Sequence, residues 1–482
     1  MSANREPGPR SSWWPRILGA GLLVACLALR LQVAGRANLE DDAFITFRYA
    51  ANLAEGGGFA YNHGERVLGT TSPLLTLLLA VLALLGVDVP SAGLALSVLG
   101  SVVCCVLIFA IVTRLTGSLV GAVGGAALFA LSSLQARVAA SGMDTALMQA
   151  LMLGSFALLI AGRNTAAGLL GGFTALTRPE GVIWLALALP FACGDRRLRW
   201  GALSAALLPP LAWLAFATWH FGSPVPQSVT AKLGHAGWAA PNAADVTVEL
   251  LKALGPSRLA VTALLLALGL AFWRERRLLL PIGFAGGFLL GYGLTRPVMY
   301  FWYPGPLDGA FCLVGAWLLG DALSAASRPG NRTRTALRGA YALTIAAAFA
   351  ATLLARTGNH YSLLTRPRPP EQHLRLARWL NQHTSHTDTI LVGDVGYVGY
   401  YNRDRRVLDF YGLVWRGVRF EVAPAMLQDG AWLSDLTASA APTIIACENA
   451  AAPSRPPPGY SYIAAPEMAH FRIMRKAKAS PH

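Results

Sequence analysis

Residues 40–49 read Glu-Asp-Asp-Ala-Phe-Ile-Thr-Phe-Arg-Tyr and follow the first long apolar run of the chain. Two adjacent carboxylates, Asp41 and Asp42, therefore stand where a membrane segment meets water. Charges beside a bilayer are costly unless water, a cation or a partner compensates them. Helix capping explains one Asp well, because Asp is a good N-cap and its charge suits a helix N-terminus. Capping explains the second carboxylate less well, so the pair is a candidate catalytic feature.

The composition indicates a polytopic membrane protein. Hydrophobic residues make up 54% of the 482 residues and charged residues 13%, whereas an average soluble domain carries about 25% charged residues. The apolar residues gather in blocks of roughly 15–22 residues, close to the length that crosses a bilayer. The formal net charge is +15, but the arginines lie mostly in short loops between these blocks, where membrane topology accounts for them.

Several other functions and sites are not supported by the sequence. The chain has no zinc-finger spacing, RNP-like motif or basic helix, so nucleic-acid binding is not expected. Its six cysteines include no CxxC pair. The cysteines therefore predict neither a disulfide framework nor a zinc site.

Three densely basic junctions orient the membrane segments. They are residues 196–199, 274–277 and 328–338. Short basic loops stay in the cytoplasm, so we expect these junctions and the N-terminus to be cytoplasmic. The opposite face then carries residues 36–71, 220–256, 296–304 and everything after about residue 356. The apolar blocks predict about eleven membrane spans, with the block at 117–134 re-entrant or part of a broken helix.

The composition changes from about residue 357, where prolines at 367, 369 and 370 precede an amphipathic stretch at 371–382. Strand-like segments follow at 389–392 and 443–446. Strands alternating with helices predict a small α/β domain outside the membrane. The fold class expected is thus an all-α polytopic membrane protein with a C-terminal extracytoplasmic α/β domain. We expect the domains to be 1–356, with a first external loop at 36–71, and 357–482.

Further polar and aromatic residues fall on the predicted external face. They are Arg48, Tyr49, Glu65, Asp144, Arg178, Glu180, Lys232, Arg296, Tyr300 and Tyr303. Structural roles remain open for several of them. Asp144 could be an N-cap, Arg178 and Glu180 a local ion pair, and the aromatic run at 300–303 an interface belt.

The same residue types also suit group transfer from a lipid phosphate. Two carboxylates could act as a general base and its orienting partner. Arg178, Lys232 and Arg296 could bind a phosphate and stabilise its charge as it departs. Tyr300 and Tyr303 could stack on a sugar or guide a lipid.

The chain resembles the GT-C membrane glycosyltransferases, and within them most closely the bacterial terminal β-arabinofuranosyltransferase-like branch. The motifs that carry the resemblance lie at 41–49, 52–56, 58–62, 64–67, 72–74, 141–145, 178–181, 222–228, 231–232, 393–396, 409 and 412–413. Two positions depart from the family pattern, which often has an acidic residue at the position of Leu68 and Glu at that of Asp144. These departures bear on the donor sugar more than on the reaction.

The resemblance implies an inverting transfer from a polyprenyl-phosphate sugar, such as arabinofuranose or a hexose like mannose. The acceptor would be a cell-envelope glycan, lipid or protein on the non-cytoplasmic face of a bacterial inner membrane. The resemblance also implies that a first-loop Asp is the general base. We expect Asp41 to be the base and Asp42 its partner, with the other polar residues above binding substrate.

A transporter or flippase of lipid-linked sugars is the alternative function. Transporters often show broken helices at corresponding places in two halves, and the sequence shows no such halves. Asp41 and Asp42 could bind Mg²⁺ or Ca²⁺ through oxygen ligands. A polyprenyl monophosphate is a less demanding leaving group than a pyrophosphate–metal pair, so no obligatory metal or other cofactor is expected.

Overall fold

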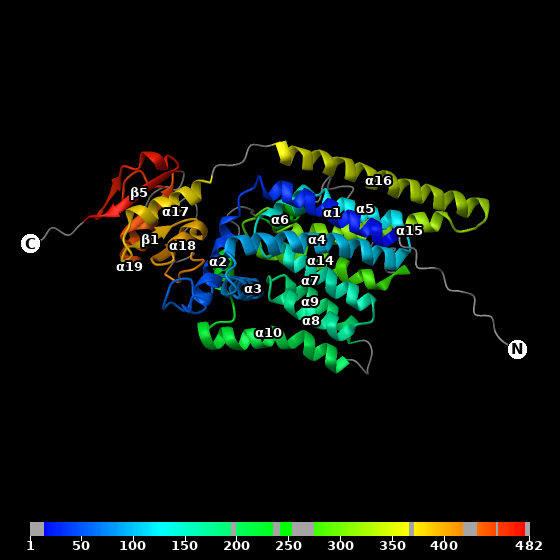
Figure 1. The fold of residues 1–482 in the computed structure, drawn as a ribbon, viewed down its shortest axis with the longest axis horizontal. Helices are drawn as coiled ribbons and strands as arrows, with labels where there is room; N and C mark the ends of the chain where they lie inside the picture. The colour runs from blue at the N-terminus through cyan, green and yellow to red at the C-terminus, as the bar shows by residue number, and fades with distance from the viewer. Residues whose placement is uncertain are drawn as a thin grey trace, which may run out of the picture.

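The computed structural model describes residues 14–193, 199–234, 242–252, 274–365, 371–417, 431–449 and 452–477. Long helices form a bundle at one end of the elongated molecule, and a small α/β unit lies at the other end (Figure 1). Some predicted features fall outside the described residues. They are the apolar block 257–273, most of the basic junction 196–199 and the prolines at 367, 369 and 370.

The bundle confirms a mostly helical, multi-pass membrane protein. Six described helices are long and apolar enough to cross a bilayer: α1 (Trp14–Ala34), α4 (Val89–Thr116), α10 (Arg199–Phe221), α14 (Leu279–Thr295), α15 (Gly305–Ala326) and α16 (Arg332–Thr365). The helices α5 (Leu119–Ala130) and α6 (Ser133–Ala140) are bent by 57° at their break and make a seventh if they form one span. The block at 117–134 is therefore interrupted, as predicted.

Shorter helices complete the described part of the bundle. They are α3 (Pro73–Leu84), α7 (Thr145–Ile160), α8 (Asn164–Ala175), α9 (Gly181–Ala192), α11 (Gln227–Gly234), α12 (Ala243–Lys252) and the 3₁₀ turn η1 (Arg276–Leu278). The helix α16 runs through the predicted domain boundary at 356/357 and continues to Thr365. Its extension is consistent with the sequence, since the next proline comes only at position 367.

Small residues let the helices of the bundle approach closely. Gly168 and Gly172 lie one turn apart on α8, and a Cβ atom at either would stand 2.5 or 2.4 Å from a backbone carbonyl oxygen of α10. A Cβ at Gly121 of α5 would stand 2.7 Å from the Cα of Gly320 on α15. This spacing of small residues is typical of helices that pack within a membrane, where close contact replaces the hydrophobic driving force.

A buried polar group joins three helices inside the bundle. Asp308 of α15 forms an ion pair with Arg356 of α16. Asp308 also accepts hydrogen bonds from Ser132 (2.8 Å) and Gln135 (3.2 Å) at the N-terminal end of α6. Since an unpaired charge in this environment is strongly unfavourable, Arg356 and Asp308 hold α16 to the bundle as a pair.

The C-terminal unit is built on a five-stranded sheet in the order β2-β1-β3-β5-β4. Its strands are β1 (Thr389–Val392), β2 (Arg406–Asp409), β3 (Ile444–Glu448), β4 (Tyr460–Ile463) and β5 (Phe471–Lys476). Its helices are α17 (Gln372–His383), α18 (Val395–Tyr401), α19 (Ala431–Ala440) and the 3₁₀ turn η3 (Pro466–Met468). The predicted amphipathic helix and both predicted strands are present as α17, β1 and β3.

The strand β1 is parallel to both of its neighbours, β2 and β3. Ile390 of β1 lies opposite Val407 of β2 and Ile444 of β3. The other two pairings, β3 with β5 and β5 with β4, are antiparallel. A strand with parallel neighbours is usually covered on both faces, which explains why the last three residues of β1, Ile-Leu-Val, are all apolar and buried.

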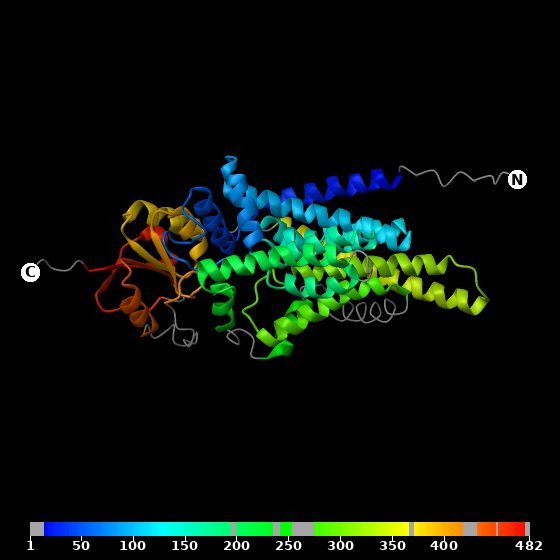
Figure 2. The same cartoon turned by 90° about the horizontal axis from the view of Figure 1, so that it is seen from below.

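The helix α2 (Asp41–Ala54) lies between the bundle and the C-terminal unit in both views (Figure 1 and Figure 2). It packs against α18 so closely that a Cβ at Gly396 would stand 1.7 Å from the backbone oxygen of Asp41. The rings of Phe44 and Tyr397 meet at 3.9 Å between centroids. The hydroxyl of Tyr61 donates to the carbonyl of Val395 at 2.7 Å. We call this contact between α2 and α18 the seam.

We expect Gly396→Ala to open the seam and to destabilise the protein by at least about 2 kcal/mol, because no rotamer change can relieve a clash with backbone. The measurement is the midpoint of thermal unfolding of the purified protein in detergent. Gly339→Ala on α16 is the control, since nothing lies within 4 Å of a Cβ there. Equal midpoints for both variants would contradict the tight packing of α18 on α2.

Candidate active site

A cavity of about 370 Å³ lies beside the start of α2, where the bundle, α11 and the C-terminal unit meet. Its walls come from segments far apart in the chain, namely the starts of α2 and α7, residues 69–71, the α8–α9 junction, α11, the end of α14 and residues 302–303. Half of the twelve predicted site residues line it: Asp42, Asp144, Arg178, Glu180, Lys232 and Tyr303.

Asp42, in the first turn of α2, forms an ion pair with Lys232 of α11. The Nζ atom of Lys232 lies 3.3 Å from Oδ2 of Asp42 and 3.3 Å from the hydroxyl of Tyr303. Both side chains keep some exposure, 22% for Asp42 and 25% for Lys232. Burial alone would lower the pKa of Lys232, but Asp42 and the nearby phenols raise it above its usual value. The ion pair of Asp42 and Lys232 is therefore open to the cavity, which both residues line.

Asp41 is adjacent in sequence but faces another part of the molecule. Its two carboxylate oxygens accept hydrogen bonds from the backbone N–H groups of Gly396 (2.7 Å) and Tyr397 (2.8 Å). These N–H groups belong to the first turn of α18, so Asp41 caps that helix from across the seam. Burial and the neighbouring Asp394 raise the pKa of Asp41 to about 7, although the two backbone donors oppose the shift.

The divergence of the two carboxylates follows from helix geometry. Glu40 is the N-cap of α2, and both Asp residues lie in its first turn. Neighbouring positions on an α-helix point about 100° apart, so one side chain reaches the seam while the other reaches the cavity. The sequence predicted Asp41 as the base and Asp42 as its partner, whereas in this arrangement Asp42 is the one of the two that lines the cavity.

Arg178 forms a second polar cluster on the cavity wall. Its guanidinium donates to Asp144 Oδ1 at 2.8 Å and to Glu180 Oε1 at 2.9 Å. The hydroxyl of Tyr292 also donates to Glu180. Arg178, Asp144 and Glu180 are only 5%, 4% and 8% exposed. The local ion pair that the sequence left open is therefore present, and it includes Asp144 as well.

The charges that line the cavity limit how a phosphate could bind there. They comprise three carboxylates, on Asp42, Asp144 and Glu180, and two cations, on Arg178 and Lys232. Arg178 already lies between two carboxylates, and its stacking on Tyr303, at 5.5 Å from Cζ to the ring centroid, fixes it further. Lys232 has one carboxylate partner and a flexible stem, so it is the cation more readily turned toward a ligand.

Arg48 is not in the cavity, although the sequence suggested that it binds substrate. Its side chain is completely buried. Its guanidinium donates to the backbone carbonyls of Tyr61 (2.6 Å), Gly399 (2.7 Å) and Arg405 (2.9 Å). Arg48 therefore ties the first loop to the C-terminal unit, and a substrate could reach it only if the seam opened.

Tyr49 and Glu65 also have structural partners outside the cavity. The hydroxyl of Tyr49 donates to the carbonyl of Val67 at 2.5 Å and accepts from the N–H of Gly69 at 2.8 Å. Glu65 forms an ion pair with Arg406 at the start of β2, at 2.5 Å. These contacts shape the loop that carries residues 69–71 to the cavity, which argues against direct substrate contact by either side chain.

Two more predicted residues lie beside the cavity without lining it. Arg296 ends α14 with a left-handed backbone conformation, φ 43°. Tyr300 is 38% exposed, and its ring centroid lies 5.2 Å from the Nζ of Lys232. Tyr300 can therefore act on the site through Lys232, whereas Arg296 serves as the turn between α14 and the aromatic run.

Several lining residues were not predicted from the sequence. The hydroxyl-bearing ones are Thr46, Thr70, Thr71, Ser228, Tyr292 and Thr295. Thr46 and Thr70 bond each other through their hydroxyls at 3.0 Å, which fixes the wall beside α2. Tyr292 was not predicted because it lies inside an apolar block of the sequence. Its hydroxyl group was the only local sign of a polar role there.

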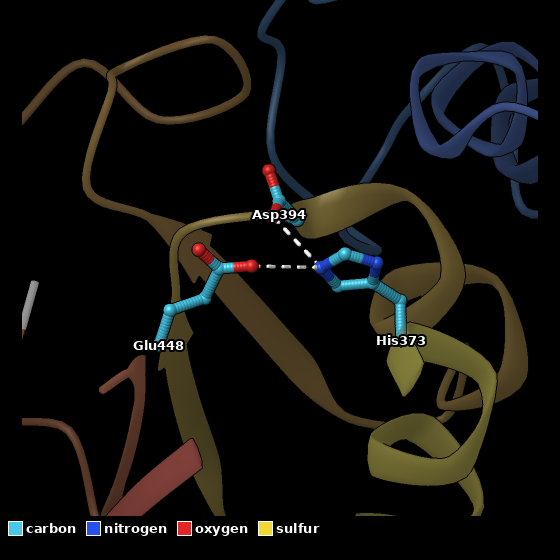
Figure 3. A group of neighbouring side chains, drawn as sticks. All are labelled: His373, Asp394 and Glu448. Carbon is cyan, nitrogen blue, oxygen red and sulfur yellow. Dashed lines mark ion pairs between the residues drawn. The ribbon is translucent and has the colours of Figure 1, made fainter. Parts of the chain in front are cut away.

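The carboxylates of Asp41 and Asp42 are directed at different partners. Asp41 is directed at the backbone of α18, and Asp42 at Lys232. A different group, His373 with Asp394 and Glu448, brings ligand atoms together in the C-terminal unit (Figure 3).

A family model described as "Domain of unknown function (DUF8728)" matches residues 363–479, which hold the C-terminal unit. No curated protein matches the chain.

Solved structures do match it over nearly its whole length. ArnT from Cupriavidus metallidurans in the apo state is 12% identical with a TM-score of 0.60, over 97% of this chain and 99% of that one. The same protein bound to undecaprenyl phosphate is 13% identical with a TM-score of 0.56, over 98% and 100%.

Two other membrane enzymes share the architecture. The Archaeoglobus fulgidus oligosaccharyltransferase in its apo form is 11% identical with a TM-score of 0.59, over 91% of this chain and 70% of that one. The arabinofuranosyltransferase AftD from Mycobacteria is 17% identical with a TM-score of 0.52, over 99% of this chain and 41% of that one. The predicted GT-C fold is thereby confirmed: the chain has the fold of the GT-C membrane glycosyltransferases.

Proposed function

We propose that the chain is an inverting glycosyltransferase that moves a sugar from a polyprenyl-phosphate donor to a cell-envelope glycan, lipid or protein. The observation that carries the proposal is the cavity beside α2, where the carboxylate of Asp42 lies 3.3 Å from the cation of Lys232. The shared fold supports the reaction class, and the undecaprenyl phosphate bound to ArnT supports the donor class. Arabinofuranose and a hexose such as mannose are the donor sugars we propose to test first.

In this proposal Asp42 is the general base. The acceptor hydroxyl attacks C1 of the donor sugar, the bond between C1 and the phosphate oxygen breaks, and the phosphate leaves with the electron pair. Asp42 takes the proton of the hydroxyl. Lys232, which pairs with Asp42 in the structure, turns toward the donor phosphate when the donor binds. This movement both stabilises the leaving charge and frees Asp42 to accept the proton.

The Arg178 cluster supplies the fixed polar wall of the site. Oε2 of Glu180 is buried and has no hydrogen-bond partner among the described residues. Carboxylate oxygens accept hydrogen bonds from sugar hydroxyls, so Asp144 and Glu180 are proposed to orient the sugar. Tyr303 and Tyr300, which flank Lys232, are proposed to cover the sugar ring or the first part of the lipid.

The proposal includes a location and a topology. The chain would lie in a bacterial inner membrane with about eleven spans. Its N-terminus and basic junctions would be cytoplasmic. The cavity and the C-terminal unit would then face the other side, where donor and acceptor meet. The proposed transfer of the sugar needs no metal ion.

The test is transfer by the purified protein from a panel of radiolabelled polyprenyl-phosphate sugars to a cell-envelope glycan extract. We expect wild-type protein to use one donor. Lys232→Met should weaken donor use by about 10-fold to 100-fold, since a charge-assisted hydrogen bond to the phosphate is lost, with less change in acceptor KM. Movement of labelled lipid across liposomes without transfer from any donor would favour the flippase instead.

A further inference from the structure

The cluster of His373, Asp394 and Glu448 lies at one edge of the C-terminal sheet. His373 belongs to the first turn of α17, Asp394 lies two residues after β1, and Glu448 is the last residue of β3. In Figure 3, dashed lines join one ring nitrogen of His373 to both carboxylates. Its Nε2 atom is 2.8 Å from Asp394 Oδ2 and 3.4 Å from Glu448 Oε1. The three ligand atoms all lie within 4.8 Å of one another.

The position in the fold favours a bound ligand. The strands β1 and β3 are parallel neighbours, and both carboxylates follow or end these strands at their carboxyl ends. Open parallel sheets bind ligands in the crevice outside these ends. A cavity of about 30 Å³ lies here, lined by the cluster together with Gly393 and Tyr411 among others. The side chains are 29%, 43% and 53% exposed, in the order His373, Asp394 and Glu448, so an ion can enter from water.

The separations within the cluster are compatible with ligands of one metal ion. The Nε2 atom of His373 makes no well-aligned hydrogen bond to any described residue, despite its nearness to Asp394. Two ligand atoms that each lie about 2.1 Å from one metal ion, at tetrahedral or octahedral angles, are about 3.0–3.4 Å apart. The observed 3.4 Å is the upper end of that range, and the observed 2.8 Å lies just below its lower end.

We propose that His373, Asp394 and Glu448 form a binding site for one divalent transition-metal ion, with Zn²⁺ as the representative ion. One imidazole nitrogen with two carboxylate oxygens suits Zn²⁺ or Mn²⁺, whereas Mg²⁺ and Ca²⁺ prefer oxygen ligands alone. Three protein ligands leave a further position for water. The site goes beyond the proposed transfer reaction and does not depend on it, since none of the three residues lines the cavity beside α2.

The ion would connect α17, the end of β3 and the residue that precedes α18, next to the seam. Asp394 precedes the first turn of α18, whose backbone N–H groups at Gly396 and Tyr397 hold Asp41. A metal that fixes Asp394 to α17 and β3 would therefore fix the turn that receives α2. The expected role of the ion is structural, and bound metal should raise the thermal stability of the chain.

The test uses the full-length protein in detergent, stripped with a chelator and titrated with Zn²⁺ while bound metal is counted. We expect one equivalent to bind. His373→Ala and Glu448→Gln should each weaken binding at least about tenfold and remove the stabilisation by Zn²⁺. Glu448→Gln is a mild change at a side chain that is 53% exposed, so it reports on binding in a folded protein.

His386→Ala is the matched control. His386 also pairs with a carboxylate, that of Asp404, but it is 78% exposed and belongs to no described group of three ligands. Its loss should leave Zn²⁺ binding unchanged. The proposal is overturned if the wild-type protein binds no Zn²⁺, or if Glu448→Gln and His386→Ala bind it as the wild-type protein does.

Discussion

Asp42→Asn is expected to reduce sugar transfer by about 100-fold to 10,000-fold, the usual contribution of a general base. The substitution keeps the size of the side chain but removes its ability to take a proton. Because Asp42 is 22% exposed and contacts Lys232 at the cavity, the protein should still fold. The measurement is the initial rate of transfer from the donor that the wild-type protein uses, alongside the midpoint of thermal unfolding.

Asp41→Asn is the matched comparison, because it makes the same change one residue earlier. Asp41 accepts from two backbone N–H groups of α18, and Asn offers one oxygen in place of two. One buried donor would be left without a partner, at a cost of about 1–3 kcal/mol. We therefore expect a lower unfolding temperature and a smaller loss of activity. Normal stability with no transfer for Asp41→Asn, and normal transfer for Asp42→Asn, would assign the base to Asp41.

The membrane class and much of the C-terminal unit could be predicted from the sequence because they depend on local pattern. The length of apolar runs defines membrane helices, and β1 and β3 are short apolar runs beside turn residues. The strand β5 was not predicted, because its sequence Phe-Arg-Ile-Met-Arg-Lys does not alternate regularly between apolar and polar residues and contains three charged side chains. Its place in the sheet depends on pairing with β3 across a long stretch of chain.

The roles within the candidate site depend on contacts that no local pattern records. The choice between Asp41 and Asp42 follows from the docking of α18, more than 350 residues later in the chain. Arg48 looks like a substrate ligand in the sequence, yet its partners include the carbonyl of Gly399. The motif residues of the first loop thus divide into two sets, one that faces the cavity and one that attaches the C-terminal unit.

That division gives the C-terminal unit a place in the proposed mechanism. The helix α2 carries Asp42 on one side and is held by α18 on the other through Asp41 and Arg48, and Tyr61 of the following loop adds a third bond to α18. A general base must stay within about 3 Å of the hydroxyl it deprotonates. A loop beside a membrane would not hold that position alone, so the sheet and its helices act as the rigid support of α2.

Arg178→Ala is expected to have the largest effect on stability. The guanidinium lies between Asp144 and Glu180 at 2.8 and 2.9 Å, and all three side chains are buried. Removing it leaves two carboxylates close together without a cation, which costs about 3–5 kcal/mol for a buried pair that loses one partner. We expect a marked fall in the midpoint of thermal unfolding in detergent, together with loss of transfer.

The triple variant Arg178→Met, Asp144→Asn and Glu180→Gln separates the effect on stability from the effect on transfer. It removes the cation and both carboxylates together, so no uncompensated charge remains, and most of the lost stability should return. Transfer should not return, because the proposed hydrogen-bond acceptors for the sugar are then amides with different donors and acceptors. If Arg178→Ala instead unfolds at the wild-type temperature and only raises the donor KM, Arg178 is a phosphate ligand. Its two carboxylate partners would then have to be protonated or rearranged when the donor binds.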